Sequence, residues 1–180
     1  MALATHQIAL NYASLTYMVP LGIASAAAVS VGHAVGAGDG ERARRAGWLA
    51  LGLGTGFMLL AAVAFLTAPG ALIALYTSDA EVVALGTRLL LIVAAFEIFD
   101  GIQTVSTGAL RGLGETRVPM LANLAGYWVL GLPLGLTLCF VLHWGIYGLW
   151  IGLLAALIVI AATLLARWQR DSARLARRAV

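Results

Sequence analysis

The sequence has no lysine, a single cysteine and few charged residues of either sign. Charged residues make up 11% of the 180 positions, hydrophobic residues make up 62%, and the mean hydropathy is +0.95. Because about a quarter of the residues of a typical soluble domain are charged, this composition excludes a soluble domain and indicates an integral membrane protein. Cys139 lies among Leu and Phe, so the chain holds no disulfide framework, and this cysteine is expected to pack in the core.

The absence of lysine also bears on nucleic acid as a partner. The 11 basic residues are all arginine, which gives a net charge of +3, and all except Arg88 lie between or beyond the hydrophobic runs. This distribution is typical of membrane topology and not of a phosphate-binding patch. We therefore expect no nucleic-acid partner.

Five hydrophobic runs are long enough to cross a bilayer, which takes roughly 20 apolar residues per helix. They cover residues 7–31, 47–68, 83–110, 119–142 and 146–166. The sequence therefore predicts an all-α integral membrane protein with five transmembrane helices. Residues 1–168 form its membrane part, and residues 169–180 form a basic tail.

The arginines predict an orientation. They cluster after the first run, after the third run and in the tail, and none follows the second or fourth run. By the positive-inside rule these three segments are cytoplasmic, which places the N-terminus outside and the C-terminus in the cytoplasm. Residues 1–10 show no charged leader or signal-peptide pattern. We therefore expect the chain to be part of a longer membrane protein whose preceding helices bring residue 1 to the outer face.

A helix start is predicted before the third run. Ser78 followed by Glu81 has the spacing of a capping box, with Ser78 as the N-cap.

Polar residues gather on one side of the third run. Gln103 accompanies a series at helical steps of three and four: Glu97, Asp100, Thr104, Thr107 and Arg111. The other side is expected to face lipid and carries Ile98, Ile102, Val105 and Ala109. The first run has a second polar face with Gln7, Asn11, Ser14 and Tyr17. Together the two faces predict a shared polar cavity. For Asn11, Ser14, Thr104 and Thr107 ordinary interhelical hydrogen bonding remains open as the alternative role.

The two acids are the sharpest signal in the sequence. A charge at the centre of a bilayer costs about 2.5–3.5 kcal/mol even on the lenient insertion scale, so an acid there needs a partner, a proton or an ion. No arginine lies at the depth of Glu97 and Asp100, since Arg88 is nearer the outer end and Arg111 is at the inner end. We therefore expect the pair to bind a proton or a cation. The ring of Tyr17 could add a cation–π contact or could simply pack.

Other chemistry has little support. His6, His33 and His143 are scattered, so they predict no metal site. No Ser/His/Asp or Cys/His arrangement occurs at matched depth, and no lysine follows the glycine-rich stretch 52–57 as a P-loop requires. We expect neither an enzyme nor a bound cofactor.

Three stretches resemble a known family. They are similar to the C-terminal lobe of MATE transporters, of the NorM-type branch. The stretches are HQIALNYASLTYMVPLGIASAAAVSVGHAVGAGD, FDGIQTVSTGALRGLGETRVPM, and GYWVLGLPLG with GIYGLWIGLLAAL. The similarity runs from about residue 6 to 167. It implies a twelve-helix, two-lobe fold, of which this chain resembles helices eight to twelve. The N-terminal lobe and the seventh helix would be missing partners.

The resemblance also implies a function and site residues. Family members export organic cations and drugs by antiport against sodium ions or protons, in the cell inner membrane. Asp100 matches the cation-binding acid of the tenth helix, which implies a coupling ion, Na⁺ or H⁺, at this residue and no metal other than that sodium ion. Tyr17 matches a tyrosine that contributes in some members. Gln7 and Asp79 match positions that approach cationic ligands in some members. Asn11, Phe96 and Gln103 complete the expected substrate contacts.

The chain departs from the family pattern at two places. Phe96 stands where some relatives have tyrosine, and Glu97 is a second acid that many lack. Two alternatives to drug efflux are a lipid-linked saccharide flippase of the same superfamily, which should line its cavity with basic residues, and a non-transporting fragment, assembly partner or decayed reading frame.

Overall fold

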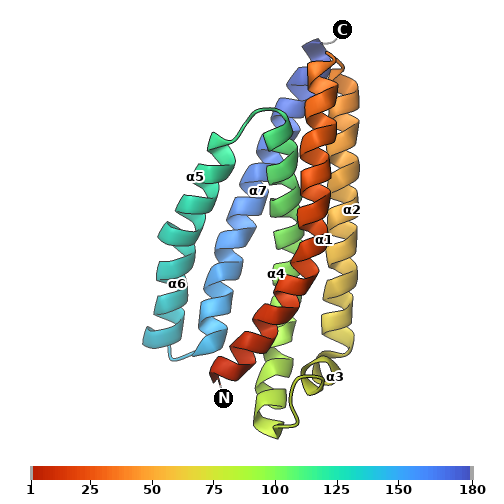
Figure 1. Ribbon diagram of the computed structural model, residues 1–180. Helices are drawn as coiled ribbons and strands as arrows, with labels where there is room; N and C mark the ends of the chain where they lie inside the picture. The colour runs from red at the N-terminus through yellow and green to blue at the C-terminus, as the bar shows by residue number, and fades with distance from the viewer. Residues whose placement is uncertain (1, 179–180) are drawn as a thin grey trace.

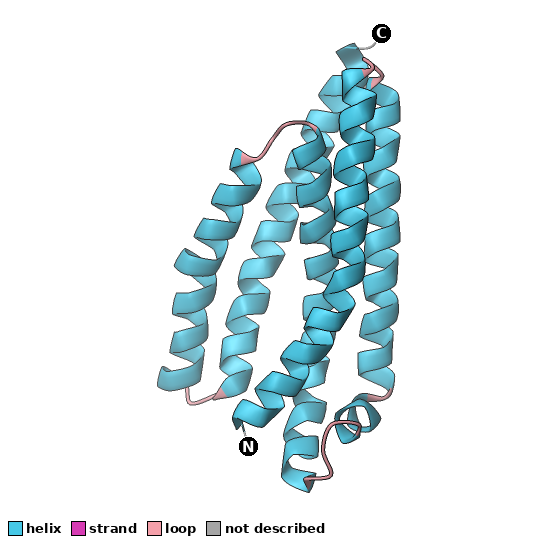
Figure 2. Ribbon diagram, viewed as in Figure 1, coloured by secondary structure: helices cyan, strands magenta, loops and turns pink. Residues whose placement is uncertain are grey.

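The computed structural model describes residues 2–178, and every regular element in that range is helical (Figures 1 and 2). The first two passes are α1 (Ala2–Gly36) and α2 (Gly40–Thr67). A short helix, α3 (Pro69–Ala74), leads to α4 (Ala80–Gly112). The fourth pass consists of α5 (Arg117–Ala125), the π-helical η1 (Gly126–Gly131), α6 (Leu132–Leu136) and the π-helical η2 (Thr137–Val141). The last pass is α7 (Ile146–Arg178).

The five predicted membrane spans are confirmed. Five helices are long and apolar enough to cross a membrane: 2–36, 40–67, 80–112, 117–141 and 146–175. Each contains nearly all of the predicted run, and most extend beyond it by several residues. The hydrophobic runs end at the first polar residues, whereas the helical backbone hydrogen bonding continues through them. Residues 169–178 of the predicted basic tail continue α7 without a break.

The turns follow from residues that cap or break helices. Gly38 has a φ of +75°, which glycine adopts without strain, and the Asp39 carboxylate accepts a hydrogen bond of 2.9 Å from the Arg42 N–H at the start of α2. At the start of α4 the predicted N-cap, Ser78, is wrong by one residue. Asp79 is the cap, and its Oδ1 accepts from the N–H groups of Glu81 and Val82.

The α4 helix is the centre of the bundle. It packs against α1, α2, α3 and α7, whereas the fourth pass packs along α7 and stands apart from α1 and α2 in Figure 1. The prediction that the Ile98, Ile102, Val105 and Ala109 side of α4 faces lipid is therefore wrong. Val105 and Ala109 are fully buried, and Val105 lies against Gly54 of α2.

Glycine permits the closest helix contacts. A Cβ on Gly108 of α4 would overlap the Ala24 backbone of α1, and one on Gly152 of α7 would overlap the Gly135 backbone of the fourth pass. Such small-residue contacts are a main source of helix association in membranes. They fix α1 against α4 on one side and the fourth pass against α7 on the other.

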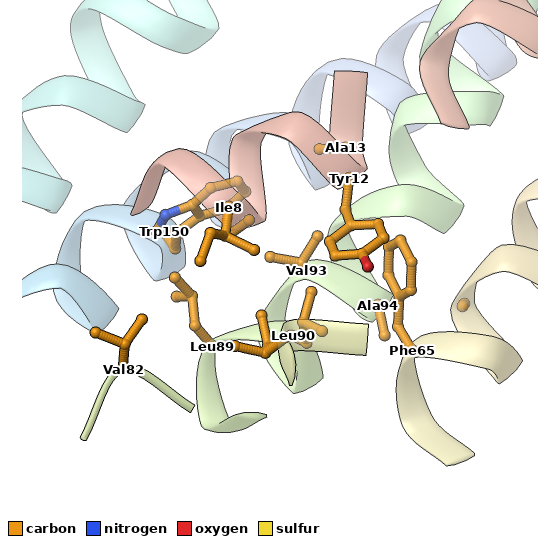
Figure 3. Packing of buried hydrophobic residues seen from close by; sticks show 13 residues of the cluster. Ile8, Tyr12, Ala13, Phe65, Val82, Leu89, Leu90, Val93, Ala94 and Trp150 are labelled. Carbon is orange, nitrogen blue, oxygen red and sulfur yellow. The ribbon is translucent and has the colours of Figure 1, made fainter. Parts of the chain in front are cut away.

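An apolar cluster closes one end of the bundle. Figure 3 shows Tyr12 of α1 turned toward Phe65 of α2, with their ring centroids 5.7 Å apart, above Leu90 and Val93 of α4. The Tyr12 hydroxyl donates a 2.7 Å hydrogen bond to the Leu72 carbonyl, which holds α3 against α1. At this end the N-terminal part of α1 leans toward α7 (Figure 1), and Pro20 lies in the interior of the same helix.

Candidate functional site

The two acids of α4 lie inside the bundle, about halfway along the helix. Glu97 is fully buried and Asp100, one turn further, is 9% exposed. Neither carboxylate oxygen of Glu97 has a hydrogen-bond partner within the described residues. A buried acid without partners costs considerable free energy, so the structure presents the uncompensated carboxylate that the hydropathy pattern predicts.

Among the side chains that the structure describes, no basic group neutralises this pair. The ion pairs found among these side chains lie near the helix ends and join Arg44 and Arg45 to Glu41, and Arg167 to Glu115 and Asp171. Arg88 and Arg111 are exposed. The charge of Glu97 and Asp100 is therefore not balanced by arginine.

Oxygen-bearing side chains surround the acids. Thr16 of α1 lies beside the Glu97 carboxyl, but its hydroxyl donates to the Tyr12 carbonyl oxygen over 2.9 Å and not to the acid. Tyr127 of η1 lies within electrostatic reach of both Asp100 and Tyr17. We call Glu97, Asp100, Thr16, Tyr17 and Tyr127 the acid site. Carboxylate, hydroxyl and phenol oxygens are ligands that suit a hard cation or a bound proton.

Tyr127 and Thr16 were not identified from the sequence. Tyr127 follows Asn123 by four residues, so two polar side chains share one face of the fourth pass. That spacing is a usable signal, but it does not show which helix the face meets. Thr16 lies beside Tyr17 on α1 and could have been read as interhelical polar packing.

A chain of aromatic rings leads from the acids toward α7. Phe96 meets the Trp150 ring edge to face, with centroids 5.5 Å apart, and Trp150 meets His6 in the same way at 5.9 Å. The Trp150 Nε1–H donates to His6 Nδ1 over 3.3 Å. Beside them lies a groove of about 400 Å³ whose lining includes His6, Tyr127, Trp128 and Trp150. We call it the outer groove.

Gln103 occupies the turn of α4 that follows Asp100. Its Nε2 donates to Asn123 Oδ1 of α5 over 2.6 Å, and the Thr104 hydroxyl lies 3.4 Å from its Oε1. Thr107 donates to the Gln103 main-chain carbonyl over 2.8 Å, so its role in the structure is local hydrogen bonding. The polar side of α4 thus meets the fourth pass through one amide pair.

The remaining predicted contacts lie apart from the acids. Gln7, Asn11 and Ser14 are on the exposed side of α1. Asp79 caps α4 at the helix end. The structure therefore places Glu97, Asp100, Tyr17, Phe96 and Gln103 in one part of the bundle, and Gln7, Asn11 and Asp79 elsewhere. The binding roles predicted for all of these residues stay predictions.

Comparison with known proteins places this arrangement in a family. The MatE family profile matches residues 1–137. A probable multidrug resistance protein NorM from Burkholderia pseudomallei (strain K96243) is 49% identical over 183 residues, which covers 99% of this chain and 39% of that protein. The chain thus spans about two fifths of the length of the curated relatives it matches.

Solved structures share the fold. The crystal structure of the eukaryotic MATE transporter AtDTX14 superposes with a TM-score of 0.87 at 24% identity, covering 99% of this chain and 41% of that one. An outward-facing multidrug resistance MATE family transporter of the MOP superfamily gives a TM-score of 0.86 at 18% identity, covering 97% and 39%. The resemblance read from the sequence motifs is confirmed: the chain belongs to the MatE family, which consists of multi-pass membrane transporters and is not a family of enzymes.

Proposed function

We propose that this chain forms the C-terminal lobe of a cation-coupled antiporter that exports organic cations and drugs. The observation that carries the proposal is the buried pair of Glu97 and Asp100, which has no basic partner among the described side chains. A relative that is 49% identical bears the name multidrug resistance protein NorM, which supports drug efflux as the transport activity. The absence of arginine at the acid site disfavours an anionic lipid-linked saccharide as substrate.

The mechanism follows from charge balance at low dielectric. Two carboxylates that face each other away from water are stabilised when a proton or a sodium ion binds between them. An organic cation that approaches Asp100 competes with that ion, because one site accommodates one compensating charge. Binding of one ligand thus favours release of the other, and the occupancy of Asp100 biases the lobe between its access states.

The outer groove suits the apolar part of such a substrate. Its volume of about 400 Å³ is in the range of sites for drug-sized molecules, and tryptophan and tyrosine rings form part of its wall. Tyr127 lines this groove and also lies near Asp100. We propose that a planar aromatic cation lies with its rings in the groove and its positive charge toward Asp100, where Tyr17 and Tyr127 add cation–π attraction.

The location and partners complete the proposal. The arginines at the start of α2, at the end of α4 and at the end of α7 favour a cytoplasmic position, so the chain would lie in the cell inner membrane with its N-terminus outside and its C-terminus in the cytoplasm. Its partners are the lipid bilayer, organic cation substrates, and an N-terminal lobe with a seventh helix. The coupling ion is Na⁺ or H⁺, and no nucleic acid takes part.

A chimera tests this function. This chain replaces the matching two fifths of the Burkholderia pseudomallei relative, and ethidium efflux is measured in cells without other efflux pumps. Asp100→Asn should reduce efflux by about a hundredfold or to background, since losing one charge of a buried pair costs about 2–5 kcal/mol. Imposed sodium and proton gradients identify the coupling ion.

The control is Glu81→Gln, which removes an exposed acid at the start of α4. This variant should retain the efflux rate of the parent chimera. Unchanged efflux and unchanged cation dependence in Asp100→Asn would sink the proposed role of the acid site.

A further inference from the structure

A second groove lies between α4 and α5, on the arginine-rich side of the acid site. It has a volume of about 280 Å³ and is lined in part by Thr107, Arg111, Thr116 and Asn123. We call it the inner vestibule. Arg111 and Thr116 are exposed, so the vestibule opens at the end of the bundle where α4 turns into α5.

One hydrogen bond lies between the vestibule and the acid site. Gln103 is one turn from Asp100 in one direction and one turn from Thr107 of the vestibule in the other. On the facing helix, Asn123 lines the vestibule, and Tyr127, one turn later, is within electrostatic reach of Asp100. The 2.6 Å bond between Gln103 Nε2 and Asn123 Oδ1 therefore lies between the level of Asp100 and the level of the vestibule along the two helices.

Both amides are held in place for this contact. Asn123 Nδ2 donates to the Pro119 carbonyl over 2.7 Å, which orients its Oδ1 toward α4. Thr104 lies on the other side of the Gln103 amide, with its hydroxyl 3.4 Å from Oε1. A pair in which each amide has a second partner is held in one orientation.

The fourth pass can move more readily than the rest of the bundle. It packs along α7 and stands apart from α1 and α2. Its helix changes from α to π immediately after Ala125. Such π-helical turns are common places for a helix to kink. A small rotation there would carry Asn123 away from Gln103.

From this geometry we infer that Gln103 and Asn123 form a gate between the acid site and the inner vestibule. The closed bond keeps water and small cations in the vestibule from reaching Asp100. Parting of the two amides connects Asp100 to the arginine-rich side. The use of this path by a coupling ion rests on the proposed function, whereas the gating of water access does not.

Thiol accessibility measures the gate directly. In a Cys139→Ser background, Tyr17→Cys reports the acid site and Thr116→Cys reports the vestibule. The full chain is placed in sealed vesicles of both orientations, and a charged, membrane-impermeant methanethiosulfonate is added. Vesicles that present the vestibule should label Thr116→Cys rapidly and Tyr17→Cys slowly. Adding Asn123→Ala should then speed labelling of Tyr17→Cys by about threefold to fifteenfold, the factor that corresponds to losing one interhelical hydrogen bond in a membrane.

Two further variants make the result specific. Leu124→Ala removes the same number of heavy atoms from an exposed neighbour and should leave the rate unchanged. The double substitution Gln103→Asn with Asn123→Gln keeps the summed length of the two side chains. It should therefore return the labelling rate of Tyr17→Cys toward the slow rate seen with the native Gln103 and Asn123. The gate would be overturned if Thr116→Cys is labelled slowly in both vesicle orientations, or if Asn123→Ala does not speed the labelling of Tyr17→Cys. It would also be overturned if Leu124→Ala speeds labelling equally, or if the exchanged pair does not restore slow labelling. Because no transport is measured, these results are independent of the outcome for Asp100→Asn.

Discussion

At the scale of single residues, Glu97 is a buried acid that neither an opposite charge nor a hydrogen bond compensates in the described chain. It is fully buried, both of its carboxyl oxygens lack hydrogen-bond partners, and its acidic neighbour is one turn away. Packing does not account for such a residue, since an apolar side chain of similar volume would fill the same space at lower cost. We therefore expect that Glu97 lowers the free energy of unfolding of the lobe and that its role is to bind a cation or proton.

The substitution Glu97→Met tests that exchange. Removing the unpartnered carboxyl should raise the free energy of unfolding by about 1–3 kcal/mol, the penalty of an unsatisfied buried polar group. In the chimera the same change should weaken the dependence of efflux on the coupling ion. Unfolding by SDS in mixed micelles gives the first quantity, with Glu81→Gln as the exposed control. A less stable Glu97→Met protein would show that the carboxyl supports the fold.

The acids and the amides differ in how far sequence alone predicts them. Glu97 and Asp100 stand out because charge inside a hydrophobic run is costly wherever the helix lies. Tyr127 and Asn123 belong to the fourth pass, and their roles depend on which helix that pass meets. Helical periodicity places the two on one face but does not specify the neighbour, so the pairing of Asn123 with Gln103 required the structure.

At the scale of helices, the central position of α4 explains why the predicted lipid-facing side of this helix is wrong. The spans were predictable because bilayer thickness fixes their length. The side of α4 with Val105 and Ala109 looks lipid-facing because lipid and a packed helix both select apolar residues in a membrane. The glycines indicate that another helix packs closely here, since Gly54 of α2 accommodates Val105 and Gly108 of α4 contacts Ala24 of α1.

Gly108→Ala should therefore damage the contact between α1 and α4. The added methyl overlaps the Ala24 backbone, and overpacking of this kind costs about 1–3 kcal/mol. Gly22→Ala on α1 is the matched control, because nothing lies within 4 Å of its added Cβ, and it should be neutral or stabilising. Thermal unfolding in detergent compares the two. Equal melting temperatures for both variants would mean that the close approach of the helices is unimportant for stability.

At the scale of the whole molecule, the exposed side of the bundle is large. Beyond the lipid-facing leucines it includes the side of α1 with Gln7, Asn11 and Ser14, which are polar and lie within a membrane span. Polar side chains of this kind usually meet another helix or a water-filled space in the membrane. The chain also spans about two fifths of the length of its relatives. The exposed polar side of α1 is therefore expected to meet the segment of the relatives that this chain does not match.

Complementation in two pieces tests this expectation. The remaining three fifths of the Burkholderia pseudomallei relative, expressed as a separate polypeptide, should copurify with this chain and restore ethidium efflux, because transmembrane helices that form independently can associate afterwards. Replacing Gln7, Asn11 and Ser14 together by leucine should reduce copurification, whereas replacing the lipid-facing Leu49, Leu53 and Leu60 of α2 by alanine should not. If both triple variants copurify equally well, the polar side of α1 is not the surface that joins the two pieces.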